Sequence, residues 1–142
     1  MPPSPRISLH IDPTKYAALC EDMGIAEEPE VYFRDRLPKG SKTTYGGSGS
    51  VFGVYSATQH RIGIFTEQKQ YEYDRLRAVN AELVITLIHE LRHAWQYKHA
   101  DGASWSVVRR ERDAEGFAQE NYHKWRGVIQ LRRQTFHKKL PG

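Results

Sequence analysis

The stretch that decides the fold runs from Ile88 to Gln96 and reads IHELRHAWQ. It contains His89, Glu90 and His93 in the spacing HExxH. Residues four positions apart in a helix lie one above the other on the same face, so the two imidazoles can bind one metal ion together. Glu90 is rotated by about 100° from His89 and can reach a water molecule on that ion. The spacing therefore predicts a helix that supplies two ligands and a base to a metal centre.

The neighbouring residues indicate that this helix is long and starts near Asn80. Asn80 is a suitable N-cap, and Glu82 falls in the first turn, where the helix dipole favours an acid. Apolar side chains recur at steps of three and four residues and predict a buried face made of Val84, Leu87, Ile88, Leu91 and Trp95. His89 and His93 fall opposite that face. The alternative interpretation is a pair of exposed or hydrogen-bonded histidines on a surface helix.

The composition is that of an ordinary globular protein. The chain has 142 residues, 39% hydrophobic and 27% charged, so residues 1–142 fit a single domain with a real core. No apolar run long enough for a membrane span exists, and the N-terminus lacks the shape of a signal peptide. One cysteine, Cys20, suits a reducing cytoplasm. The net charge of +4 permits contact with nucleic acid without requiring it.

The residues before the HExxH helix predict an α+β fold. Asp12 and Pro13 are a typical N-cap and first helical residue, and this N-terminal helix is expected to reach Met23 and stop at Gly24. A small antiparallel sheet of about three strands is expected from the apolar runs 31–33, 51–56 and 61–66, the last two forming a hairpin.

A second long helix is expected after Asp101-Gly102. It begins near Ser104 or Ser106, reaches about Trp125, and packs on the HExxH helix. It can continue past Gly127 into a basic C-terminal extension, residues 126–142. Outside these elements, residues 1–5 are expected to be a flexible N-terminus and the Gly- and Ser-rich segment 38–50 a loop.

A catalytic zinc site needs three protein ligands and one open position, so His89 and His93 need a partner. One face of the second helix carries a single charged residue, Glu111, among Val107, Ala114, Ala118, Tyr122, Trp125 and Ile129. A carboxylate on an apolar face is costly to bury without a positive partner, and a zinc ion on the facing helix would be such a partner. Glu115 lies one turn further on and can accept a hydrogen bond from the second nitrogen of a ligating histidine.

His99 is the alternative third ligand. HELRHAWQYKH fits the spacing HExxHxxGxxH, in which the last histidine completes the site. That pattern needs a glycine that turns the chain back to the metal, and this sequence has Gln96 there. If the helix continues, His99 lies about 9 Å beyond His93 along the axis. Glu111 is therefore preferred over His99.

Taken together, the two motifs resemble those of gluzincin zinc metallopeptidases. HELRH matches their active-site helix, and ERDAEGFA, from Glu111 to Ala118, is similar to the ExxADxFA motif of ImmA/IrrE-like and HtpX-like peptidases. Glu115 stands where aspartate is usual. The small size resembles the minigluzincins. The resemblance covers about a quarter of the chain and implies a zincin-like fold, one Zn²⁺ ion, and a peptide or protein substrate that pairs with an edge strand, either 51–56 or 61–66.

The resemblance also implies roles in peptide hydrolysis. His89, His93 and Glu111 would bind zinc, and Glu90 would act as general base and then return the proton to the leaving amine. A donor for the oxyanion is harder to assign. Tyr97 and His123 are the candidates for that role or for substrate contact, although both residue types serve more often in packing or on the surface.

Two other functions also fit the sequence. The first is a non-catalytic zinc protein with a structural or interaction role, against which an intact Glu90 and the lack of thiolate ligands argue. The second is a protease that acts on nucleic-acid-associated proteins, because HELRHAWQY also resembles SprT-like proteases and the C-terminal tail is basic. A solvated helix face explains the tail more simply.

Overall fold

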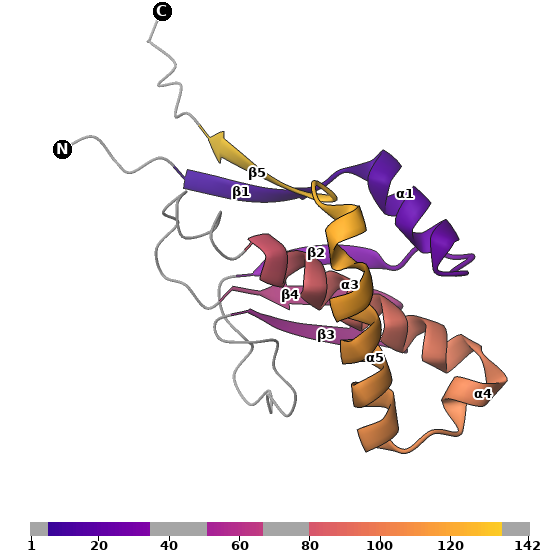
Figure 1. Cartoon of the computed structure of the whole chain (residues 1–142). Coiled ribbons are helices and arrows are strands. Elements are labelled where there is room, and N and C mark those ends of the chain that lie inside the picture. The colour runs from indigo at the N-terminus through magenta and orange to yellow at the C-terminus, as the bar shows by residue number, and fades with distance from the viewer. Residues whose placement is uncertain (1–5, 35–50, 67–79, 135–142) are drawn as a thin grey trace, which may run out of the picture.

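The computed structural model describes residues 6–34, 51–66 and 80–134 (Figure 1). The predicted loop 38–50, the flexible end 1–5 and the last residues of the predicted C-terminal extension lie outside the described residues. The described chain is α+β, as expected, with helices on small sheets. Among the described helices, none is long and apolar enough to span a membrane.

The N-terminal helix forms where its capping residues place it. Helix α1 spans Pro13–Asp22, and the carboxylate of Asp12 accepts hydrogen bonds from the backbone N–H groups of Thr14 and Lys15, both at 3.1 Å. Gly24 has a φ of 73°, in the left-handed region where glycine is favoured, and ends the helix. The predicted start and stop of this helix are confirmed.

The three-stranded sheet contains the predicted hairpin and one parallel pair. Strands β3 (Phe52–Ser56) and β4 (Arg61–Phe65) pair antiparallel. Strand β2 (Glu30–Arg34) pairs with β4 in parallel, and the order is β2-β4-β3. The expectation of a wholly antiparallel sheet is therefore wrong. The chain between β2 and β3 is long enough to reach the far edge of the sheet, so β4 returns between them in the direction of β2.

Helix α3 (Asn80–Lys98) lies at the centre of the fold, against β3 and β4 on one side and α5 on the other (Figure 1). Its predicted apolar face is buried at Val84, Leu87, Ile88 and Leu91, while Trp95 is half-buried. The core that this face enters includes Leu19 and Cys20 of α1 and the strand residues Val51, Ile62 and Ile64. Burial of one helix face fixes the direction in which the opposite face points.

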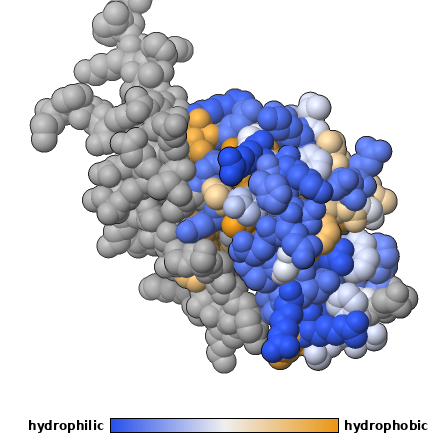
Figure 2. Space-filling model, in the orientation of Figure 1, coloured by the Kyte–Doolittle hydropathy of each residue, from blue (hydrophilic) through white to orange (hydrophobic). Residues whose placement is uncertain are grey.

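The second long helix is α5, which spans Val107–Asn121 after the short helix α4 (Ala100–Ala103). Ser106 is its N-cap and accepts a hydrogen bond from the backbone N–H of Arg109 at 3.2 Å. The surface that α5 presents to the viewer is largely hydrophilic (Figure 2). A 3₁₀ turn, Tyr122–Trp125, follows α5. The start of this helix agrees with the sequence expectation, whereas the α-helix ends at Asn121 and only the 3₁₀ turn reaches Trp125.

The chain beyond α5 departs from the sequence expectation. Gly127 has a φ of 89°, and the helix does not continue past it. Residues Ile129–Gln134, within the predicted basic extension, form strand β5, which pairs antiparallel with β1 (Arg6–Ile11). Neither strand was expected. Leu9 and Ile11 pack on the core together with the buried Ile129, so the pair has one apolar face that the basic residues obscured in the sequence.

Candidate metal centre

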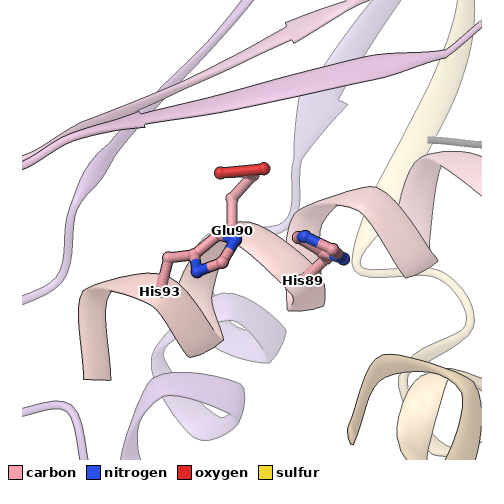
Figure 3. Close-up of side chains that lie close together, drawn as sticks. All are labelled: His89, Glu90 and His93. Carbon is pink, nitrogen blue, oxygen red and sulfur yellow. The ribbon is translucent and has the colours of Figure 1, made fainter. Parts of the chain in front are cut away.

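Two imidazoles and one carboxylate meet between α3 and α5. His89 and His93 project from successive turns of α3 (Figure 3). The Nε2 atom of His89 lies 3.0 Å from one carboxylate oxygen of Glu111, and the Nε2 atom of His93 lies 3.0 Å from the other. Glu111 comes from α5, which packs on α3; Ala114 and Ala118 of the predicted apolar face are buried, whereas Val107 of that face is exposed. The packing of the two helices thus brings these three side chains together.

The remaining ring nitrogens have other partners. The Nδ1–H of His89 donates to Glu115 at 2.9 Å, and the Nδ1–H of His93 donates to the side-chain oxygen of Gln96 at 2.9 Å. The orientation of the Gln96 amide is set by its nitrogen, which donates to Arg110 O and to Asp113, both at 2.9 Å. Its oxygen must then face His93, so the proton belongs on Nδ1 of that ring. In neutral His93 the lone pair on Nε2 therefore points at Glu111, whereas both ring nitrogens of His89 face carboxylate oxygens.

This arrangement of donor atoms favours positive charge. Burial alone would lower the pKa of His89, but its hydrogen bond to Glu111 and the charge of Glu90 raise it to about 9. Burial would raise the pKa of Glu111, but its hydrogen bonds to His89 and His93 lower it to about 2. Two imidazole lone pairs and a carboxylate that face one another repel unless a cation or added protons lie between them. The donor set, two nitrogens and one carboxylate, fits the three protein ligands of a catalytic zinc ion.

Glu90 lies on the other side of the two histidines, toward β3. Ligand atoms of His89, Glu90 and His93 lie within 4.8 Å of one another, but Glu111 makes the closer approach to both Nε2 atoms. The Glu90 carboxylate points toward the strands (Figure 3) and is only 5% exposed. Burial raises its pKa, whereas the charges of His93 and His89 and, to a smaller extent, a backbone hydrogen bond from Tyr55 oppose that rise. A buried carboxylate with a raised pKa holds a proton more readily than an exposed one.

Gly53 permits the close approach of β3 to Glu90. A Cβ atom on Gly53 would lie 2.6 Å from Thr86 Cγ2 and 2.7 Å from Glu90 Cγ, so a larger residue would push the strand from the helix. Sequence reasoning missed this role. The available signal was a glycine inside a predicted strand, which often marks a close backbone approach.

A buried polar network supports His93 and was also missed. Gln96 is fully buried, at 0% exposure, and bonds to Asp113. Asp113 accepts two hydrogen bonds from Arg92, at 2.7 and 3.3 Å, and the Arg92 guanidinium lies over the rings of Trp95 and Phe117. In the sequence, Gln96 was noticed only as the residue that replaces a glycine. The network links α3 to α5 and holds the Gln96 amide against the His93 ring.

The structure does not bring His99 or His123 to this cluster. The exposed ring of His99 donates to Trp95 O at 3.0 Å and stacks on the Trp95 ring at 4.2 Å. His123 is exposed in the 3₁₀ turn, with its ring against Tyr122. It lies eight residues after Glu115, about 12 Å along the helix. Tyr97 lies one turn beyond His93, with its ring 5.9 Å from that of Tyr55.

Comparisons of the chain with protein-family models, with curated proteins and with solved structures found no match.

Proposed function

We propose that the protein is a zinc metallopeptidase of the gluzincin class, with a zincin-like arrangement of its two central helices. The observation that carries this proposal is the position of Glu111, whose two oxygens lie 3.0 Å from the Nε2 atoms of His89 and His93. The sequence motif by itself offers two ligands. The packing of α5 on α3 supplies a third donor, and Glu90 stands beside the set without being required as a ligand.

The roles of the side chains follow from their positions. His89, His93 and Glu111 would hold a zinc ion, which would supply Lewis acidity toward the substrate carbonyl and an attacking water. Glu90 would act as the general base toward an attacking water and would return the proton to the leaving nitrogen of the peptide. Its burial beneath β3 favours the protonated form once the proton has been taken up. Glu115 and Gln96 hold the two imidazoles in the tautomer that leaves Nε2 free.

The sheet offers a place for an extended peptide. In the described part of the chain, β4 pairs on both sides, whereas β3 pairs only with β4. Of the two strands considered from the sequence, β3 is therefore the one with an edge for strand addition. The same strand contacts Glu90 through Gly53 and Tyr55. A peptide that pairs with β3 would run past the catalytic carboxylate, which makes an unfolded segment of a protein the natural substrate class.

Substitution of Glu90 by glutamine tests this mechanism. We expect Glu90→Gln to bind one zinc ion per chain and to lose hydrolysis of quenched-fluorescent casein, because the amide cannot accept the proton. Glu111→Gln should lose zinc. Glu120→Gln, an exposed change on the same helix as Glu111, is the matched control and should keep both properties.

Zinc content by native mass spectrometry and the rate of casein cleavage are the two measurements. Hydrolysis by the Glu90→Gln protein would refute the role of the base. A wild-type protein that binds zinc and cleaves nothing would instead support a structural role for the ion. Full zinc binding by Glu111→Gln would show that Glu111 is not the third zinc ligand.

A further inference from the structure

We infer that Tyr55, Tyr97 and Arg110 form a substrate subsite for an aromatic or large aliphatic side chain, one turn beyond His93 on α3. The inference rests on the proposed peptidase function and names the residue class that the enzyme selects. The three residues come from β3, α3 and α5, the same three elements that surround the metal centre.

Strand β3 and helix α3 run alongside each other in the same direction at this site. Gly53 faces Thr86 and Glu90, and two residues later Tyr55 faces Tyr97. A peptide paired with β3 follows the same line, because paired strands are nearly parallel to one another. Its path therefore leads from Glu90 toward Tyr97.

Tyr97 is placed to contact the second residue from the cleaved bond. It lies one helical turn after His93, about 6 Å along the axis. An extended peptide advances about 3.3 Å per residue, so two residues cover that distance. The subsite is thus separate from the atoms that react.

The surroundings of Tyr97 define the chemistry of the ligand. Its side chain is 53% exposed, although its ring already contacts that of Tyr55 at 5.9 Å. By contrast Trp95, on the same helix, is covered by Arg92 and His99. A third aromatic ring can pack at the 4.5–7 Å centroid distances that such pairs prefer. Tyr97 therefore offers an aromatic surface that the described fold leaves open.

Arg110 closes the subsite on the α5 side. Its guanidinium carbon lies 5.8 Å from the centre of the Tyr97 ring, and its Nε donates to Trp105 O at 3.1 Å, which fixes the side chain. A fixed positive charge disfavours a lysine or arginine of the substrate at the same place. The subsite should accept phenylalanine, tyrosine, tryptophan or leucine and reject basic residues.

The test uses the zinc-loaded full chain and a peptide library made by digesting a proteome with a glutamyl endopeptidase. Mass spectrometry of the products should show aromatic and large aliphatic residues enriched, and lysine and arginine depleted, two positions from the cleaved bond. For a matched pair of peptides with phenylalanine or alanine there, Tyr97→Ala should reduce the ratio of their kcat/KM values about 3- to 10-fold. Tyr97→Phe should keep the wild-type ratio, as should Val108→Ala, an exposed apolar change elsewhere on α5.

The outcomes separate this inference from the proposed function. Cleavage without a preference at that position, or a preference that survives Tyr97→Ala, would overturn the subsite and leave the peptidase standing. An equal fall in kcat/KM for both peptides in Tyr97→Phe would assign the Tyr97 hydroxyl to catalysis and would also overturn the subsite. If nothing is cleaved, the peptidase proposal fails. Fluorescence anisotropy then gives the affinity of the same two peptides for zinc-loaded Glu90→Gln. Equal affinities of the two peptides would overturn the subsite.

Discussion

Replacement of Gln96 by methionine probes how the protein holds His93. Methionine keeps the length and volume of the side chain but removes the amide, so the core remains filled. Three hydrogen bonds are lost, one from His93 Nδ1 and two to Arg110 O and Asp113. Asp113 keeps both of its bonds to Arg92, whereas Nδ1 of His93 loses the hydrogen-bond acceptor that the structure gives it. The perturbation is therefore concentrated on one proposed zinc ligand.

Two magnitudes follow from these contacts. Loss of a partner that orients a ligating histidine lowers metal affinity about 10- to 100-fold, or about 1.4–2.7 kcal/mol. Buried groups left without partners cost about 1–3 kcal/mol in the free energy of unfolding, and this cost is expected in the metal-free protein as well. Zinc affinity and metal-free stability should both fall in Gln96→Met.

Competition with a chromophoric chelator gives the zinc affinity, and urea unfolding in the presence of EDTA gives the metal-free stability. Gln130→Met is the control, because Gln130 donates one bond to Asp12 at 3.2 Å, away from the proposed zinc ligands. It should lose some stability and keep its zinc affinity. If Gln96→Met lost stability but bound zinc within about twofold of wild type, Gln96 would be a packing residue only. The hydrogen bond from Gln96 would then not determine how His93 binds zinc.

Two further predictions concern packing and thiol chemistry. Gly53→Ala should lower the free energy of unfolding by about 1–3 kcal/mol, because its Cβ would meet Thr86 and Glu90. Gly116 in α5 has open space around it, so Gly116→Ala should raise that free energy by about 0.5–1 kcal/mol. If urea unfolding gave the same change for both variants, the close approach of β3 to α3 would be contradicted. Burial raises the pKa of the Cys20 thiol to about 11. A disulfide reagent at pH 8 should therefore modify Cys20 slowly in the folded protein and rapidly in denaturant, and rapid reaction without denaturant would contradict the buried position.

The sequence was informative about the candidate metal centre wherever the pattern is local. His89, Glu90 and His93 belong to one helix, and helical periodicity is sufficient to place them on neighbouring faces. Glu111 was identifiable because it is the only charge on an apolar face, and its burial required a positive partner on another element. The need of Glu111 for a positive partner could be predicted without knowledge of how the two helices cross.

The contacts that the sequence did not reveal join residues far apart in the chain. In a local pattern Gln96 is one more polar residue near a helix end. Its role in orienting His93 depends on its hydrogen bonds to Asp113 and Arg110 of another helix. The parallel pairing of β2 with β4 depends on which edge the intervening chain reaches. The strand β5 was obscured because it has only two apolar residues, Ile129 and Leu131, among glutamines and arginines, a composition that also suits a solvated extension.

The pairing of β1 with β5 places Arg6 opposite Gln134. The two ends of the described chain are therefore neighbours across a strand ladder, and they leave the fold at the same side (Figure 1). Proteins with adjacent ends tolerate insertion into a host and circular permutation, provided that new ends open in an exposed turn. The β3–β4 turn is such a place, since Ala57 and Gln59 are exposed. The helices α3 and α5, which carry the proposed zinc ligands, would remain uninterrupted in a chain rearranged in this way.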